Sequence, residues 1–401
     1  MVSIASLGGL LDPGFRQAAA CVIESGTELK NIDAIAPLVA TVDLQMAREE
    51  ASAGTITIED RRREDGTWIA ADSGLFSRWA PIRISADFQT HQEVILTGYI
   101  VDLKPEYPGN AGEAKLTLEV QDEGAALSRT HLRKVFGDPD AMSDLEILKE
   151  LIKDADLSAD SASADGQKSR SLTVEGTPIQ FLRERAQANG YELIFNEGEV
   201  YFGPKRLEGS IQSPILVYAG RATNCRTFNL GDKADMPDLV QVDLAQREEG
   251  AETETTVVGA NEPVLGSSPA AAEGAGLGTP HVWRVGHEGD ETPEEATARA
   301  QGLVNEHAFK LRGSGELDGS LYGHVLRPGR MVTIDGPGTR YGGIYYVDKV
   351  AHAFNAEGYT QTFDVMRNAT GETDAPSSPL SAATSAIGGL FSASGLSAGL
   401  G

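Results

Sequence analysis

The sequence predicts a mainly β fold with an α+β insertion, and three observations carry this prediction. Short segments in which apolar residues alternate, such as Pro81–Ser85 and Lys115–Val120, are typical of half-buried strands. The 45 glycines and 18 prolines among 401 residues favour many turns and little long helix. Helix-start signals occur at Ser143–Glu146, Thr177–Gln180 and Thr292–Glu295, where a hydroxyl and a Glu or Gln three residues later can satisfy free backbone amides.

Strand-like segments fall into two groups, one before and one after the middle of the chain. Short β segments separated by turn signals suggest a barrel or a sandwich in each group. The segments are residues 38–44, 55–58, 81–85, 94–101 and 115–120, and then 215–218, 226–230, 239–244, 331–334, 343–351 and 359–366.

The middle of the chain predicts a small α+β module. The helix after Ser143 places Ile147, Leu148 and Leu151 on one face. The helix after Thr177 has Ile179, Leu182 and Ala186 on its apolar side and ends at Asn189-Gly190. The segments 191–195 and 199–202 flank a turn and form a hairpin pattern.

Charge and hydropathy exclude several classes of protein. Lys and Arg number 34 and Asp and Glu 59, a net charge of −25. This excess disfavours a protein that grips nucleic acid or an anionic membrane, because both need clustered basic residues. No apolar run reaches about 18 residues, and Met1–Leu11 has no basic side chain before its apolar run. We expect synthesis in the bacterial cytoplasm without a signal peptide, and no membrane anchor.

Catalytic and metal-binding patterns are weak. Gly395-Leu-Ser-Ala-Gly399 matches G-x-S-x-G, but it lies in a Ser/Gly/Ala-rich tail with no chain left for the other catalytic residues. The seven histidines include no i, i+4 pair, and Cys21 and Cys225 stand alone. We therefore expect no enzyme activity, no catalytic residue, no cofactor and no metal, which is typical of a structural or assembly protein.

Several segments, in order along residues 38–368, resemble the late control D family of phage tail proteins. The resemblance rests on the strand with Thr97-Gly98, the strand that ends in Asp122, and the C-terminal run with Gly342-Gly343, His352 and Arg367. The matching segments are Leu96–Ile100, Leu116–Asp122, Leu127–Arg129, Gly176–Ala186, Gly190–Tyr191, Gly198–Gly203, Arg327–Gly329, Gly342–Val347 and Tyr359–Arg367.

That family supplies the baseplate hub of contractile tails and is related to the hub part of type VI secretion spike proteins. The resemblance implies a ring-shaped homotrimer with two tube-like β-barrel domains in each chain. Such a trimer adapts the six-fold tail tube to a three-fold spike and lines the delivery channel. The implied partners are the tail tube protein, a separate trimeric spike protein and other baseplate proteins, in a virion baseplate or injection-device particle. Nucleic acid or other cargo would pass an acidic wall without specific binding.

The implied domain layout assigns the whole chain. It comprises a first barrel (1–126), the α+β lobe (127–205), a discontinuous second barrel (206–245 and 312–368), a loop and helix excursion (246–311) and a tail (369–401). Channel-lining candidates are Glu316, Asp318 and Asp335. Spike-contact candidates are Ile387, Leu390, Phe391 and Leu396, which can line one side of a short helix.

Two other functions remain open from the sequence. The first is a tail-associated cell-wall hydrolase, for which a pair of carboxylates in a cleft would be needed. The second is a peptidoglycan- or carbohydrate-binding module, suggested by the small α+β lobe. The parent particle, phage or bacterial injection system, is not specified by these residues.

Overall fold

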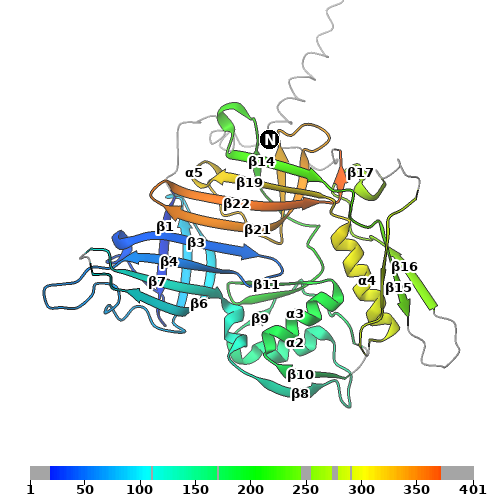
Figure 1. Ribbon diagram of the computed structural model, residues 1–401, viewed down its shortest axis with the longest axis horizontal. Helices are drawn as coiled ribbons and strands as arrows, with labels where there is room; N and C mark the ends of the chain where they lie inside the picture. Colours follow the sequence, from blue (N-terminus) through cyan, green and yellow to red (C-terminus); the bar gives the residue numbers. More distant parts are fainter. Residues whose placement is uncertain are drawn as a thin grey trace, which may run out of the picture.

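The computed structural model describes residues 19–109, 112–168, 171–244, 254–272, 279–289 and 291–371. Its centre is one sheet of thirteen strands, drawn from both ends of this range (Figure 1). Seven strands come from the N-terminal part: β1 (Ala20–Ser25), β2 (Lys30–Asn31), β3 (Val39–Ala47), β4 (Ala53–Glu59), β5 (Pro81–Asp87), β6 (Gln92–Glu106) and β7 (Lys115–Asp122). Six come from the C-terminal part: β13 (Ile211–Leu216), β14 (Cys225–Asp232), β19 (Leu311–Asp318), β20 (Met331–Asp335), β21 (Gly343–Asn355) and β22 (Gly358–Arg367).

The alternating residues of these strands separate two faces of the sheet. In β4, Ile56 and Ile58 are fully buried, whereas the alternating Thr55 and Thr57 are partly exposed. The same two-residue period appears in β7, where Leu116, Leu118 and Val120 are buried. The buried side chains of the N-terminal strands form one core, to which Phe354 and Tyr359 of the C-terminal strands contribute. The other buried side chains of the C-terminal strands fall into a second core around Tyr345 and Phe363 and a third around Tyr346 and Met366.

The two halves of the sheet are joined through β21. The order runs β14-β19-β22-β21-β3-β4-β7-β6-β5-β1-β2, with β13 paired to β20 and β20 paired to β21. β21 has 13 residues, and its pairing with β22 shifts register between Val347 and Lys349. Before the shift it pairs with β20, and after it Lys349–Phe354 pair antiparallel with β3.

This pairing corrects the expectation of two closed barrels. Because the long strand β21 is shared, the strands of both halves belong to one sheet, and that sheet stays open among the described residues, with β14 and β2 at its ends. The mainly β fold with an α+β insertion is confirmed.

The lobe contains two helices and two small sheets. Its strands are β8 (Leu132–Phe136), β9 (Ser158–Ala159), β10 (Leu172–Gly176), β11 (Glu192–Asn196) and β12 (Glu199–Gly203), with helices α2 (Asp144–Ile152) and α3 (Pro178–Asn189). Ser143 and Glu146 form the reciprocal cap of α2, and α3 ends at the left-handed Gly190. Ile179, Leu182 and Ala186 lie in the core of the lobe, as the helical pattern predicts.

The excursion forms a separate unit that includes one strand predicted for the second barrel. β15 (Leu239–Leu244) pairs with β16 (Glu254–Gly259) and β18 (Val282–Val285), and not with the large sheet. Helix α4 (Pro293–His307) covers β15, because Ala296, Ala300 and Val304 pack on Val240 and Val242. Residues 239–244 therefore belong with the excursion.

The other elements are short. They are η1 (Ala36–Leu38), η2 (Glu123–Ser128), η3 (Lys153–Ala155), η4 (Gly220–Ala222), η5 (Ala270–Ala272), α5 (Gly319–Tyr322), β17 (Ser268–Pro269) and β23 (Ala369–Thr370). Within the described ranges, no helix has the length and apolar character needed to cross a membrane.

Candidate functional site

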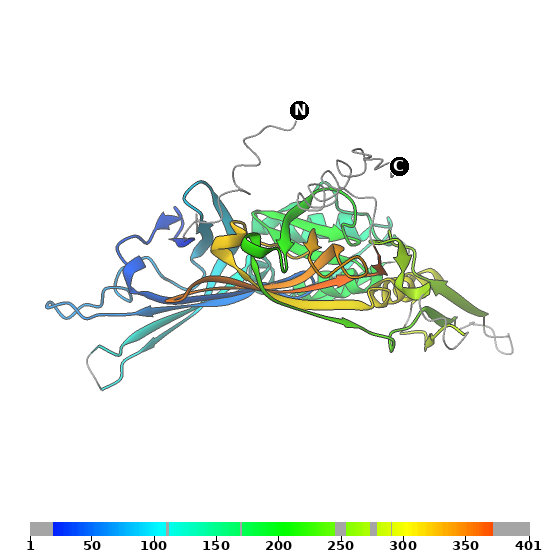
Figure 2. The same ribbon diagram turned by 90° about the horizontal axis from the view of Figure 1, so that it is seen from above.

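One face of the central sheet carries polar and small side chains, and we call it the open face. Figure 2 shows the lobe, in cyan and green, on one side of the blue and orange strands of the sheet. On the other side, paired residues form rows across the strands, such as Asp43 opposite Thr55 and Thr55 opposite Glu119. A neighbouring row joins Glu316, Thr362 and Ala351.

Acidic residues outnumber basic residues on the open face. The acidic members are Asp43, Glu59, Asp102, Glu106, Glu119, Glu316, Asp318 and Asp364, and the basic members are Lys104, Lys115, Arg226 and Lys349. Several basic side chains are paired locally, as Lys104 is with Glu119 and Asp102. The free charge that this face presents is therefore negative.

The predicted channel residues separate into two groups. Glu316 and Asp318 lie together on β19, and the guanidinium of Arg226 donates to both, at 2.8 and 3.0 Å. Asp335 is the last residue of β20 and sits beside Leu216 of β13, away from these rows. The predicted spike-contact residues Ile387, Leu390, Phe391 and Leu396 lie outside the described residues.

A buried ion cluster joins the sheet, the lobe and the excursion. Arg48, just after β3, has a side chain that is only 3% exposed. Its Nε lies 2.7 Å from Asp348 of β21, its Nη2 lies 2.9 Å from Glu306 of α4, and its Nη1 lies 3.4 Å from Glu192 of β11. We call these four residues the Arg48 cluster.

The charges of the Arg48 cluster depend on one another. Burial opposes the charge on Arg48, but Glu306, Glu192 and Asp348 outweigh it and raise the pKa of the guanidinium. Burial also works against ionisation of Glu306, yet Lys205, Arg48 and Arg312 bring its pKa down to about 2. Burial raises the pKa of Glu192, because its effect is larger than the opposing attraction of the Arg48 charge. The hydroxyl of Tyr346 donates to Glu192 at 2.7 Å, which fixes this carboxyl further.

Residues of the C-terminal motif hold the sheet together. Arg367 is fully buried, and it donates to the carbonyls of Leu265 and Gly342. Gly343 has φ +129°, and a Cβ there would lie 2.7 Å from the Arg367 side chain. His352 is buried against Tyr359, whose hydroxyl lies 2.9 Å from Nδ1. These motif residues thus support packing.

Asp122, the acidic residue that ends β7 in the N-terminal motif, is also structural. Its carboxylate accepts from the amides of Ser52, at 2.6 Å, and Gly124, at 3.0 Å. Burial nevertheless raises its pKa to about 6. The neighbouring Glu123 accepts from Gly198 of the lobe, and burial raises its pKa to about 7. Asp122 thus holds the end of β7 against the turn between β3 and β4, and Glu123 links the end of β7 to the lobe.

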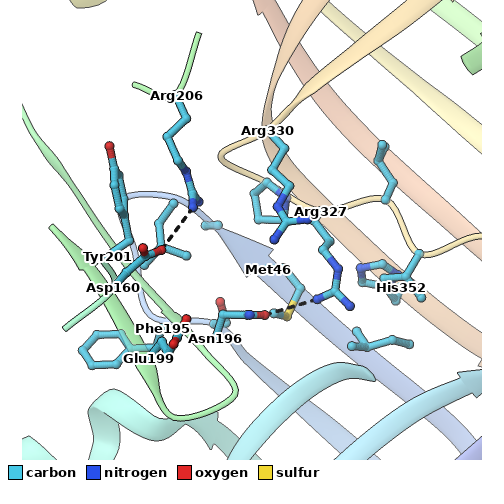
Figure 3. A pocket seen from close by; sticks show the side chains of 17 residues that line it. Met46, Asp160, Phe195, Asn196, Glu199, Tyr201, Arg206, Arg327, Arg330 and His352 are labelled. Atoms are coloured by element: carbon cyan, nitrogen blue, oxygen red, sulfur yellow. Dashed lines mark hydrogen bonds and ion pairs between the residues drawn. The ribbon is translucent and has the colours of Figure 1, made fainter. Parts of the chain in front are cut away.

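Three arginines line a polar pocket between the lobe and the sheet (Figure 3). Arg206 faces Asp160 at 3.7 Å, and Arg327 donates to Asn196 at 3.3 Å. Burial and the two other arginines lower the pKa of Arg330. Guanidinium groups gathered in this way can bind a carboxylate or another small anion. Sequence reasoning missed this pocket because its lining comes from six separate stretches of the chain.

Comparisons with known proteins place the fold. Residues 19–216 match the family model described as the Alg8 N-terminal domain. No curated protein matches the sequence.

Solved structures align along most of the chain. The 43 kDa tail protein of prophage MuSo2 from Shewanella oneidensis is 13% identical with a TM-score of 0.63, and the match covers 88% of this chain and 99% of that one. A tail protein from Neisseria meningitidis MC58 is 12% identical with a TM-score of 0.60, over 88% and 97% of the two chains. A chain of the Francisella PdpA–VgrG complex is 10% identical with a TM-score of 0.55, over 93% of this chain and 62% of that one. The chain therefore has the fold of phage tail proteins.

Proposed function

We propose that this chain is a structural component of a phage tail or contractile injection device, and that it acts as the baseplate hub. The observation that carries the proposal is the single sheet shared by both halves, with one face covered by the lobe and the other open, polar and acidic. The tail-protein fold over 88% of the chain supports it. In this proposal the role is assembly and not catalysis.

The two-part sheet suits an adaptor between symmetries. A homotrimer contributes six sheet halves around one axis, which matches a six-fold tail tube above while keeping three-fold symmetry for a spike below. The open face would line the channel. A trimer would carry 3 × (−25) = −75 formal charges, and an acidic wall repels nucleic acid or other polyanionic cargo.

The proposed partners follow from this position. They are the tail tube protein, a separate trimeric spike and other baseplate proteins. Glu316 and Asp318 would face the channel, and Ile387, Leu390, Phe391 and Leu396 would contact the spike. The proposed location is the baseplate of the particle.

The first experiment is the mass and shape of the purified full-length chain in solution. Light scattering after size exclusion should give a trimer, and negative-stain images should show rings with a central opening. A chain that stays monomeric across the micromolar range and forms no ring contradicts the proposal.

A second experiment tests the channel wall. Asp43→Lys with Thr362→Lys adds positive charge on the open face at two exposed positions. We expect the variant ring to retain DNA that the wild type does not retain. The control, Glu175→Lys with Thr173→Lys, makes the same charge change on exposed positions of β10. Equal retention by both variants would place the open face away from the channel.

A further inference from the structure

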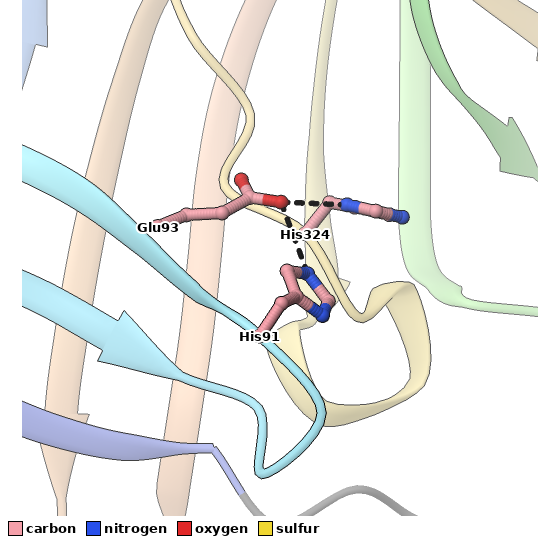
Figure 4. A group of neighbouring side chains, drawn as sticks. All are labelled: His91, Glu93 and His324. Atoms are coloured by element: carbon pink, nitrogen blue, oxygen red, sulfur yellow. Dashed lines mark hydrogen bonds and ion pairs between the residues drawn. The ribbon is translucent and has the colours of Figure 1, made fainter.

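Two neighbouring side chains at the start of β6 meet a third side chain that lies 231 residues further along the chain. His91 precedes β6, Glu93 lies in β6, and His324 lies in the loop between α5 and β20 (Figure 4). The Oε1 atom of Glu93 is 3.1 Å from Nε2 of His91 and 2.7 Å from Nδ1 of His324. These three ligand atoms all lie within 4.8 Å of one another. We propose that this trio is a binding site for a divalent transition metal ion such as Zn²⁺.

The donor set and spacing fit such an ion. Two imidazole nitrogens and one carboxylate oxygen are common ligands of zinc. With metal–ligand bonds of about 2.0–2.1 Å at tetrahedral angles, ligand atoms lie about 3.3 Å apart. The Glu93–His91 distance is already close to this value, and the Glu93–His324 distance needs to open by about half an ångström. The side chains are 37%, 23% and 46% exposed, which leaves a coordination position open to water.

Neighbouring groups orient two of the three ligands. Nδ1 of His91 lies 3.0 Å from Oγ1 of Thr90, so a proton on Nδ1 leaves the lone pair of Nε2 directed at the site. The amide of Val325 donates to Oε2 of Glu93 at 2.9 Å, which turns Oε1 toward both rings.

The loop that carries His324 is held from behind by a buried side chain. Gln361 of β22 is fully buried, and its amide oxygen accepts from Leu326 at 2.8 Å. Its amide nitrogen donates to the carbonyl of His324 at 2.8 Å. The third ligand is therefore preorganised by the sheet itself, which reduces the cost of assembling the site.

A bound ion would tie β6 in the N-terminal half to the loop before β20 in the C-terminal half. The net charge of −25 raises the local concentration of cations around the chain. Without an ion, the carboxylate of Glu93 holds the two rings through hydrogen bonds alone. The two states differ in metal stoichiometry and in how stability responds to metal, and both can be measured.

The test uses the full-length chain freed of metal by a chelator. Titration calorimetry with Zn²⁺ should give one ion per chain, and added Zn²⁺ should raise the melting temperature, because a ligand that binds the folded state stabilises it. Replacing Zn²⁺ by Co²⁺ should give the absorption spectrum of a four-coordinate ion with nitrogen and oxygen ligands.

His91→Gln and His324→Gln should each weaken Zn²⁺ binding by at least about tenfold and remove the Zn²⁺-dependent rise in melting temperature. His131→Gln is the control, because this exposed histidine directly precedes β8 of the lobe and is not a member of the trio. Melting temperatures without metal show whether the variants are folded. The proposal is overturned if the wild type binds no Zn²⁺, or if a folded His91→Gln/His324→Gln double variant keeps one ion per chain. Either result leaves the proposed assembly role untouched.

Discussion

Replacement of Arg48 by methionine tests whether the Arg48 cluster holds the units of the chain together. Methionine keeps much of the volume and removes the charge. Glu306 and Asp348 are 27% and 21% exposed and can gain water, but Glu192 is only 2% exposed and cannot. The variant therefore leaves one buried carboxyl without its cation. Breaking a buried ion pair on one side costs about 3–5 kcal/mol, and we expect a loss in that range.

Urea denaturation at one fixed protein concentration measures this loss. Arg48→Met should shift the midpoint strongly, whereas Arg133→Met, at an exposed position of β8, should not shift it measurably. The double variant Arg48→Met/Glu192→Gln should recover part of the stability, because the uncompensated carboxyl is gone and Gln can still accept from Tyr346. If Arg48→Met behaves like the control, or if the two substitutions are simply additive, the reasoning is wrong.

Three further predictions concern single side chains. Burial raises the pKa of Glu123 from 4.5 to about 7, so between these pH values the folded chain holds a proton that the unfolded chain has released. The stability of the folded chain therefore falls as pH rises from about 4.5 to about 7. Glu123→Gln should remove this loss, and its advantage in melting temperature over the wild type should grow from pH 5 to pH 8; a constant difference would contradict it. Gly343→Ala should destabilise the chain by at least about 1 kcal/mol in urea denaturation, since φ is +129° and the new Cβ meets Arg367; an unchanged midpoint would show that Arg367 moves freely. Ser143→Ala should cost about 1 kcal/mol by loss of the α2 cap, visible as faster amide exchange in the lobe, while Ser143→Asp should retain most of it.

The sequence predicted most of the individual elements because their signals are local. The two-residue period of β4 and β7 and the caps of α2 and α4 are set by neighbours within a few residues. The strand β19, which carries the channel candidates Glu316 and Asp318, was not among the strands expected from the sequence.

Features that depend on distant pairing were missed. The pairing of β21 with β3 joins residues about 300 positions apart in the chain, and no local pattern specifies it. The two histidines around Glu93 escaped a search by spacing, because His324 is 231 residues from Glu93 in the chain. Arg48 stands in a charged Arg-Glu-Glu run typical of a solvated surface, and only the fold shows that it is buried.

The pairing of β3 with β21 also has a consequence for biosynthesis. Arg48 and its partner Asp348 are separated by 300 residues, so the edge of β3 has no partner until the ribosome has made nearly all of the described chain. At about 5–20 residues per second, this wait lasts roughly 15 to 60 s. During that time β3 presents an unpaired row of backbone donors and acceptors beside the apolar Val42 and Leu44. A nascent chain in this condition can pair with its neighbours on the same polysome, so the yield of folded protein should depend on how quickly the last strands emerge.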